Sequence, residues 1–399
     1  MNNEQIVAAD QAHYLQVFGQ RALALSHGEG PYVYDLAGNK YIDFLAGIAV
    51  NVLGHAHPKL VQAIAAQAAK LIHCSNFYYT EPQAKLAASL SQISGLDRVF
   101  LANSGAEANE GALKLARKYA KSINPAKVNI ITAENSFHGR TLATLTATGQ
   151  PKYQKGYEPL PQGFSHVPYN DIDALAAAVD DTTAAVMLEP ILGEGGVKVP
   201  DDSYLAAVRE LCDRYGALLI LDEIQTGIGR TGKLFAFQHC GIQPDIVTLA
   251  KGLGGGVPIG AVLATEKAAA AFGLGDHGST FGGNPLAAAA GNAVLAVIEQ
   301  EQLLDNAAAV GAYMAAELCK LQACYPDLVT EVRGKGLMLG MQLSQPGSGI
   351  VASALRQGAL INCTAGNVLR FVPPLIINRV HVDELTAILD RSLAAAQGS

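Results

Sequence analysis

The chain has 399 residues, of which 50% are hydrophobic and 16% charged, and its formal net charge is −7. This length and composition allow two domains with a large buried core and exclude a disordered chain. The acidic balance excludes a basic surface for binding nucleic acid or anionic lipid.

Targeting and metal-binding patterns are absent from the sequence. No basic start followed by an apolar run is present, and the longest apolar stretch, at 286–298, is too short to span a bilayer. The six cysteines have neither C-x-x-C nor zinc-finger spacing, which predicts reduced thiols and no metal site. We therefore expect a cytoplasmic protein without membrane or nucleic-acid partners.

The first half of the chain shows a hairpin followed by alternating strands and helices. Residues 33–35 and 41–43 flank a turn at Gly38-Asn39, and an Ala-rich helix is predicted over 60–72. Strands are predicted at 98–102, 128–132, 184–189, 217–222 and 246–250, and helices at 107–121 and 203–215. This alternation predicts an α/β fold with a mostly parallel, doubly wound sheet.

Beyond residue 281 the pattern becomes that of an α+β unit. Helices are predicted at 285–298, 303–321 and 382–395, an antiparallel pair at 329–332 and 337–343, and a strand at 368–372. We expect a large domain at 56–276 and a smaller α+β domain formed by both chain ends, 1–55 and 277–399.

Lys251 interrupts an apolar and glycine-rich stretch, D-I-V-T-L-A-K-G-L-G-G-G-V-P at 245–258. It follows a predicted strand, at the carboxyl edge where open α/β sheets bind ligands. Apolar surroundings lower the pKa of a lysine, so its amine can form a Schiff base with an aldehyde cofactor. A single lysine is more often a surface residue, so the rest of the chain must decide between the two interpretations.

Two further motifs follow predicted strands at the same edge. Ser104 and Glu107 fit a helix-capping box, and the glycine turn that opens this helix can also bind an anion. Asp222 ends an otherwise uncharged strand, where a carboxylate is costly without a partner such as a pyridinium nitrogen. A capping role is the alternative interpretation of both motifs.

Two arginines are candidate carboxylate-binding residues. Arg140 lies in F-H-G-R-T at 137–141, where Phe137 offers an aromatic face. Arg370 lies within an apolar strand, where a charged residue more often faces solvent. The alternative interpretation of Phe137 is a core residue, which is the commoner position of a phenylalanine.

Three other motifs fail as ligand sites. The segment G-I-G-R-T-G-K-L at 227–234 has Leu234 where a phosphate-binding loop needs Ser or Thr. The glycines after Lys251 do not fit a dinucleotide fingerprint, because Pro258 blocks a helix start. His55 and His57 are joined by no carboxylate or cysteine cluster, which argues against a metal.

Taken together, these segments resemble the class III, fold type I aminotransferases, which use pyridoxal 5′-phosphate. The matching segments occur in the order of the family and cover nearly the whole chain: S-G-A-E-A-N-E at 104–110, F-H-G-R-T at 137–141, G-E-G-G at 193–196, L-D-E-I-Q-T-G-I-G-R-T-G at 221–232, T-L-A-K-G-L-G-G-G-V-P-I-G at 248–260 and S-T-F-G-G-N-P at 279–285.

The resemblance implies roles for individual residues. Lys251 would hold the cofactor as a Schiff base and move the substrate proton, and Asp222 would pair with the ring nitrogen. The other cofactor contacts that it implies are Ser104, Gly105 and Ala106 at the phosphate, Phe137 on the ring, Gln225 at the phenolic oxygen with Glu223 and Ile224 beside it, and Thr280 from the second subunit of a homodimer.

Within the family, D-F-L-A-G-I-A-V-N at 43–51, F-H-G-R-T and L-R-F-V-P-P-L at 369–375 look like the members that transfer the terminal amine of N-acetylornithine to 2-oxoglutarate. Arg140 would bind the far carboxylate and Arg370 the α-carboxylate of glutamate, with Glu194 pairing with Arg370 when that carboxylate is absent. Ser279 and Phe18 are further expected substrate contacts, Phe18 standing where many relatives have tyrosine.

Several related activities share this chemistry and stay open at this point. They are transfer from ornithine, succinylornithine, succinyldiaminopimelate or 4-aminobutyrate, and an aminomutase reaction that needs no 2-oxoglutarate. A protein of this fold that binds the cofactor without catalysis is the alternative from a different class.

Overall fold

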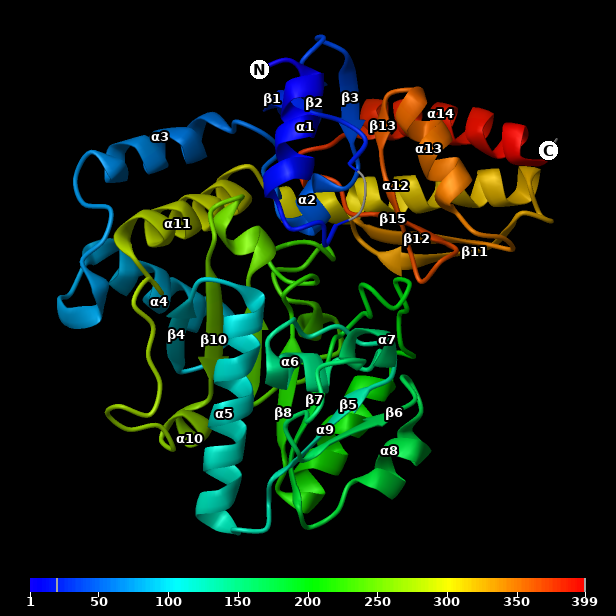
Figure 1. Ribbon diagram of the computed structural model, residues 1–399. Coiled ribbons are helices and arrows are strands. Elements are labelled where there is room, and N and C mark those ends of the chain that lie inside the picture. Colours follow the sequence, from blue (N-terminus) through cyan, green and yellow to red (C-terminus); the bar gives the residue numbers. More distant parts are fainter. Residues whose placement is uncertain (19–20, 398–399) are drawn as a thin grey trace.

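The computed structural model describes residues 1–18 and 21–397, which form a large lobe around a central sheet and a smaller lobe that contains both chain ends (Figure 1). The central sheet has the strand order β4-β10-β9-β8-β7-β5-β6. Its strands are β4 (Arg98–Ala102), β5 (Asn129–Ala133), β6 (Phe164–Val167), β7 (Thr183–Leu188), β8 (Leu218–Asp222), β9 (Ile246–Leu249) and β10 (Gly260–Ala264). Strands β5 to β9 pair in parallel, so the α/β class with a mostly parallel sheet is confirmed.

The predicted sheet differs from the structure in the number of strands and in the direction of one strand. The five predicted strands are present within one residue of the expected bounds, but β6 and β10 were not predicted. Strand β10 runs antiparallel to both β4 and β9. Its sequence, G-A-V-L-A, is short and built largely of small residues, so it has little of the β-branched and aromatic signal of a strand.

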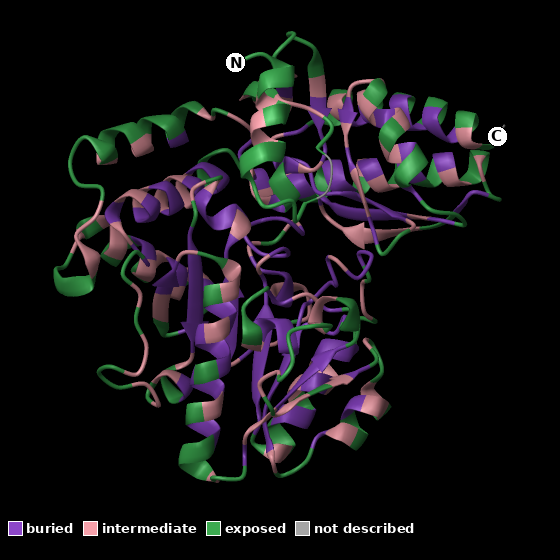
Figure 2. Cartoon of the chain, viewed as in Figure 1, coloured by how far each residue is buried: buried purple, intermediate pink, exposed green. Residues whose placement is uncertain are grey.

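Both faces of the central sheet are covered by helices. Alternate side chains of a strand point to opposite faces, so Leu218 and Ile220 pack in the cluster of α5 (Gly105–Ile123). Leu219 and Leu221 pack on the other side, in the cluster of α9 (Tyr204–Tyr215). Figure 2 shows the strands as buried between these helices. This double burial explains the continuous apolar runs.

Shorter helices complete the large lobe. They are α3 (Pro58–Ala68), α4 (Glu81–Ser94), α6 (Leu142–Ala147), α7 (Pro151–Gln154), α8 (Ile172–Ala178) and α10 (Glu266–Ala269), with the 3₁₀ turns η1 (Ser75–Phe77), η2 (Ala236–His239) and η3 (Lys251–Gly254). Helix α3 ends four residues before the predicted end at residue 72. It begins at Pro58, whose fixed φ suits a first helical turn.

The smaller lobe contains two sheets, ordered β1-β2-β3-β13 and β11-β12-β15-β14. Their strands are β1 (Leu25–Glu29), β2 (Tyr32–Asp35), β3 (Lys40–Asp43), β11 (Val329–Lys335), β12 (Met338–Leu343), β13 (Ala359–Leu360), β14 (Asn362–Thr364) and β15 (Val368–Phe371). Both predicted antiparallel pairs, β2–β3 and β11–β12, are present. Strand β13 pairs in parallel with β3 and so joins the two ends of the chain in one sheet.

Helices cover these two sheets and connect the lobes. They are α1 (Asn3–His13), α2 (Ala46–Ala49), α11 (Pro285–Gln300), α12 (Leu303–Cys324), α13 (Ser348–Arg356) and α14 (Arg379–Gln397). Helix α11 packs against α3 and α4, whereas α12 packs against α14 and β11. In the described ranges, the structure contains no helix long and apolar enough to cross a membrane.

Candidate active site

A cavity of about 440 Å³ lies at the carboxyl ends of the central strands. Ten of the residues singled out from the sequence line it: Ser104, Gly105, Ala106, Phe137, Arg140, Glu194, Asp222, Ile224, Gln225 and Lys251. They follow β4, β5, β7, β8 and β9, which end at the same edge because these strands run in one direction. The sheet therefore gathers in one place residues that are up to about 150 positions apart in the chain.

Lys251 enters the cavity from the turn between β9 and η3. Its φ of 39° lies in the left-handed region, which a residue with a side chain adopts only when the surrounding structure holds it there. Burial, followed by the nearby positive charge of Arg370, lowers the pKa of the Lys251 amine to about 8. The surface interpretation of this lysine is therefore wrong, and its amine is about half neutral at a mildly basic pH of about 8.

Asp222 is buried and held by three hydrogen bonds. Its Oδ2 accepts from Asn109 Nδ2 and His138 Nδ1, both at 2.8 Å, and its Oδ1 accepts from the amide of Ile224 at 3.0 Å. Thr248 Oγ1 donates to Asn109 Oδ1 at 2.7 Å. The contact with Ile224 is the predicted turn-capping role, and the other two fix the carboxylate at the floor of the cavity.

The sequence analysis missed the supporting residues of Asp222. Asn109 is fully buried, although it lies on a helix whose other buried side chains are mostly apolar. His138 belongs to F-H-G-R-T but received no role. A polar residue on the apolar stripe of an amphipathic helix was the available signal, because such a group needs a buried partner.

The N-terminus of α5 forms one wall of the cavity. Ser104 caps the helix by accepting the amide of Glu107 at 3.2 Å, but the Glu107 carboxylate accepts from the amide of Asn103 and not of Ser104, so only half of the predicted capping box is present. The preceding amides of Gly105 and Ala106 have no acceptor within the helix, so they can bind an anion. A Cβ on Gly105 would lie 2.8 Å from Ile224 Cδ1, so a larger residue here would require the Ile224 side chain to move.

Arg370 is fully buried on β15, so the expectation that a charged residue in this strand faces solvent is wrong. Its Nη1 forms a close ion pair with Glu194 Oε1 and donates to Gln225 Oε1 at 3.2 Å. Burial acts to raise the pKa of Glu194, but the charge and hydrogen bond of Arg370, together with Lys251 and Gln225, outweigh burial and hold the pKa below its usual value. Arg370 does not itself line the cavity, but its partners Glu194 and Gln225 do, and the ion pair neutralises the arginine directly behind them.

Arg140 is exposed and lies at the edge of the same cavity. Its guanidinium stacks over the ring of Tyr153, 3.8 Å from the centroid, and lies 5.4 Å from that of Phe137. The two rings meet edge to face with centroids 6.1 Å apart. Stacking orients the guanidinium while its N–H edge can still bind a carboxylate.

Besides Arg370, which lies behind Glu194, four predicted residues do not line the cavity. Glu223 is buried, and its carboxylate accepts from Thr226 Oγ1 and from the amides of Ala236 and Phe237. The Glu223 side chain thus supports η2, which corrects its expected position beside the cofactor. Phe18 and Thr280 are exposed away from the cavity, and Ser279 Oγ accepts from Asn103 Nδ2 at 3.1 Å.

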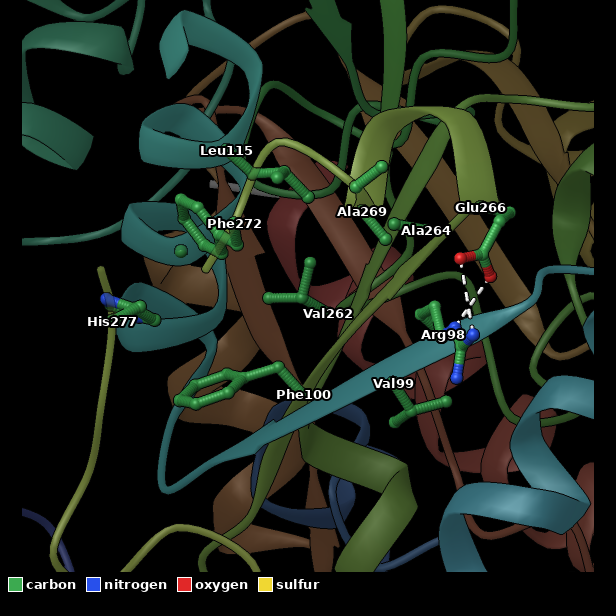
Figure 3. Close-up of a pocket in the computed structure, with 12 residues that line it drawn as sticks. Arg98, Val99, Phe100, Leu115, Val262, Ala264, Glu266, Ala269, Phe272 and His277 are labelled. Carbon is green, nitrogen blue, oxygen red and sulfur yellow. Dashed lines mark hydrogen bonds and ion pairs between the residues drawn. The ribbon is translucent and has the colours of Figure 1, made fainter. Parts of the chain in front are cut away.

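A second cavity, of about 370 Å³, lies between β4, β10, α5 and α10 (Figure 3). Its lining is mainly apolar, with Phe100, Val262 and Phe272 across it, and the ion pair of Arg98 with Glu266 lies at its edge. It contains none of the residues predicted to act in chemistry. In the described part of the chain, no group of three or more His, Cys, Asp or Glu side chains could hold a metal.

The cavity at Lys251 fits pyridoxal phosphate on three counts. A buried amine of lowered pKa suits an aldehyde, a helix N-terminus suits a phosphate, and a fixed buried carboxylate suits a ring nitrogen that carries a proton. Such a set of groups, on a mostly parallel α/β sheet, defines a transferase that works through an aldehyde cofactor.

Comparison with known proteins agrees with this class. The model of the family described as aminotransferase class-III matches residues 16–393, and the chain belongs to this family. It is 54% identical over 391 residues to acetylornithine aminotransferase of Methanocaldococcus jannaschii, with 98% of each chain covered. The ornithine aminotransferase structure of Toxoplasma gondii ME49 has a TM-score of 0.96 at 36% identity, covering 100% of this chain and 96% of that one. The acetylornithine aminotransferase of Elizabethkingia anophelis has a TM-score of 0.88 at 36% identity, covering 99% and 100%.

Proposed function

We propose that this protein uses pyridoxal 5′-phosphate to transfer the terminal amino group of N2-acetyl-L-ornithine to 2-oxoglutarate. The products are N-acetyl-L-glutamate 5-semialdehyde and L-glutamate, a step of arginine biosynthesis. The observation that carries the proposal is the buried Arg370, which is paired with Glu194, a residue that lines the same cavity as Lys251. The relatives named acetylornithine aminotransferase, which are similar over nearly the full chain, support the choice of amine.

When bound, the cofactor supplies an aldehyde that takes up the amine and a ring that takes up the electron pair released at the substrate carbon. The protein's residues do the rest. Lys251 holds the cofactor, and its Nζ moves the proton at the substrate carbon. Asp222, fixed by Asn109 and His138, keeps the ring nitrogen protonated. The amides of α5 bind the phosphate, and Phe137 packs on the ring.

The two arginines account for two different substrates in one cavity. N-acetylornithine reacts at its far amine, so its single carboxylate reaches Arg140 at the edge. Glutamate presents a second carboxylate next to the reacting carbon, and this one needs Arg370. Glu194 neutralises Arg370 while the first substrate is bound, because an unpaired arginine in a dry cavity is costly. Release of this pair admits the dicarboxylate.

A screen of single half-reactions tests the amine. N-acetylornithine is expected to convert the cofactor faster than ornithine, succinylornithine, succinyldiaminopimelate or 4-aminobutyrate, as followed by the change in cofactor absorbance. A much faster reaction with free ornithine would show that the amine is wrongly assigned. Turnover without 2-oxoglutarate would indicate an aminomutase, and a bound cofactor that reacts with no amine would indicate a binding protein.

A homodimer with shared active sites is also proposed. Large apolar side chains are exposed around η1 and near Thr280, namely Leu71, Ile72, Phe77, Tyr78, Tyr79 and Phe281. The η1 residue Asn76 donates to the carbonyl of Ser279 at 2.9 Å, so the two segments form one surface. Exposed apolar surface of this kind marks a protein interface. The proposal places Ser279 and Thr280 of one subunit at the cavity of the other.

Mixing two inactive variants tests whether sites are shared. Lys251→Ala and Thr280→Ala subunits, unfolded and refolded together, are expected to regain about a quarter of the wild-type sites, because half of random dimers carry one intact site. Lys251→Ala refolded alone serves as the control. If the mixture gains no activity although mixed dimers form, each site is built from one subunit.

The domain division and location complete the proposal. We place the large cofactor domain at 56–276 and the small domain at 1–55 and 277–399, supported by the pairing of β3 with β13. Helix α11 belongs to the second range but packs on α3 and α4 of the first, so it forms contact between the domains. Each of the six cysteines is free, which suits the reducing cytoplasm.

A further inference from the structure

Glu189 links two segments beside the active-site cavity. It follows β7, lines the cavity and is only 5% exposed. Its Oε1 accepts the amide of Phe137 at 2.9 Å, and its Oε2 accepts the amide of Gly193 at 2.9 Å. One buried carboxylate therefore holds the backbone of two segments that are more than 50 residues apart in the chain.

The two held segments carry groups of the proposed mechanism. The ring of Phe137 forms a wall of the cavity, and Gly193 directly precedes Glu194, the partner of Arg370. A Cβ on Gly193 would lie 2.5 Å from Gln225 Nε2, so this turn packs directly against the end of the Gln225 side chain. Two contacts therefore hold the backbone around Glu194: Glu189 accepts the amide of the preceding residue, and Thr364 Oγ1 donates to the Glu194 carbonyl.

Only a carboxylate can accept a strong hydrogen bond from each of the two amides. Each of its oxygens accepts, whereas an amide side chain has one acceptor and turns a donor toward the second N–H group. Burial raises the pKa of Glu189 to about 7, with His138 opposing and Asp222 reinforcing the shift. Lys251 and Tyr169 are the other titratable groups that interact with it.

We propose that Glu189 is a positioning residue that sets the balance between two ion pairs of Arg370, one with Glu194 and one with the α-carboxylate of a substrate. The inference rests on the proposed function, because it concerns the choice between an amine with a distant carboxylate and a dicarboxylate. Loosening the turn at Gly193 weakens the hold of Glu194 on Arg370. The arginine is then left unpaired while the amine substrate is bound, so the rate of the amine half-reaction falls more than the rate of the glutamate half-reaction.

The first test compares Glu189→Gln with wild type in both half-reactions. The second-order rate constant with N-acetylornithine is expected to fall about tenfold relative to that with glutamate. A loss of this size corresponds to one lost hydrogen bond to a charged group. The dissociation constant of pyridoxal phosphate, measured by fluorescence on the cofactor-free protein, is expected to rise severalfold because Phe137 loses its fixed amide.

Two further variants keep the result interpretable. Glu134→Gln makes the same chemical change at an exposed residue three positions before Phe137 and is expected to behave as wild type. Glu189→Asp keeps the charge but shortens the reach, so we expect a smaller shift of the ratio in the same direction. Equal losses in both half-reactions for both Glu189 variants would contradict the positioning role.

The pH dependence adds a readout that a structural role alone would not change. Below about pH 7, Glu189 in the wild type gains a proton and loses one good acceptor. The ratio of the amine to the glutamate rate constant is expected to fall there and to stay flat in Glu189→Gln. Lys251 acts in both half-reactions, so its own titration cancels in the ratio. An inflection that persists in Glu189→Gln would overturn the inference.

Failure of the proposed function gives a different result. A wild-type protein that reacts with glutamate but not with N-acetylornithine would contradict the substrate assignment alone. The comparison of Glu189 variants would then use whichever terminal amine reacts, and the same shift of the ratio would support the positioning role.

Discussion

Replacing Lys251 by alanine is expected to lower turnover by several orders of magnitude and to abolish covalent attachment of pyridoxal phosphate. The side chain supplies both the amine that holds the cofactor and the base that moves the substrate proton, so no neighbouring group can take over both roles. Steady-state turnover and the visible absorbance of the purified protein measure the two effects. Lys233→Ala, at an exposed lysine, is the control and should behave as wild type.

The lowered pKa of Lys251 adds a pH dependence to this prediction. The neutral amine attaches the aldehyde, and it predominates above about pH 8 rather than above the usual 10.5. The rate of cofactor attachment to the cofactor-free protein should therefore rise up to about pH 8 and level off above it. A rate still rising steeply at pH 10 would mean that the pKa of the Lys251 amine is not lowered. Wild-type turnover in Lys251→Ala would refute the assignment altogether.

Arg370→Ala is expected to slow the glutamate half-reaction about 100-fold and the N-acetylornithine half-reaction much less. Glutamate loses the charge-assisted partner of its α-carboxylate, while N-acetylornithine has no carboxylate at that place. Arg140→Ala should impair both halves, because both substrates present a far carboxylate to the edge of the cavity. Single-turnover rates with each substrate, measured separately, distinguish the two patterns.

The control for Arg370 concerns its partner. Removing the arginine leaves Glu194 partly buried without its ion pair, which adds a cost unrelated to substrate binding. The double variant Arg370→Ala with Glu194→Ala removes both charges and should recover the N-acetylornithine half while the glutamate half stays slow. Equal losses in the two half-reactions of the double variant would contradict the two-arginine scheme.

Residues at the ends of apolar strands were the most informative part of the sequence. Asp222 and Lys251 each interrupt or end a run of apolar residues, where a charge is costly unless a ligand or partner is present. Because parallel strands end at one edge, the sequence also predicted that these residues meet. The cavity brings both together with the capped helix at Ser104. Their catalytic roles stay predictions until the variants are measured.

Residues that act through distant partners could not be assigned in the same way. Glu189 looks like an ordinary polar residue at a strand end, and its contacts to Phe137 and Gly193 depend on how two loops fold over it. Asn109 and His138 were passed over, because their partner Asp222 is 113 and 84 residues away. Glu223 was misplaced because neighbours of Asp222 in sequence need not face the same way.

The sequence by itself determined the α/β pattern, the edge of the sheet at which the candidate site lies and the residues whose side chains can take part in chemistry. These follow from local rules, since strand burial, helix caps and lone charges are written into a few adjacent residues. Tertiary structure alone decided that β10 is antiparallel and that Arg370 is fully buried, and it forms the ion pair of Arg370 with Glu194 that only the family resemblance had led us to expect. Such pairings join residues up to 176 positions apart, so their energy depends on packing and desolvation that no local pattern encodes.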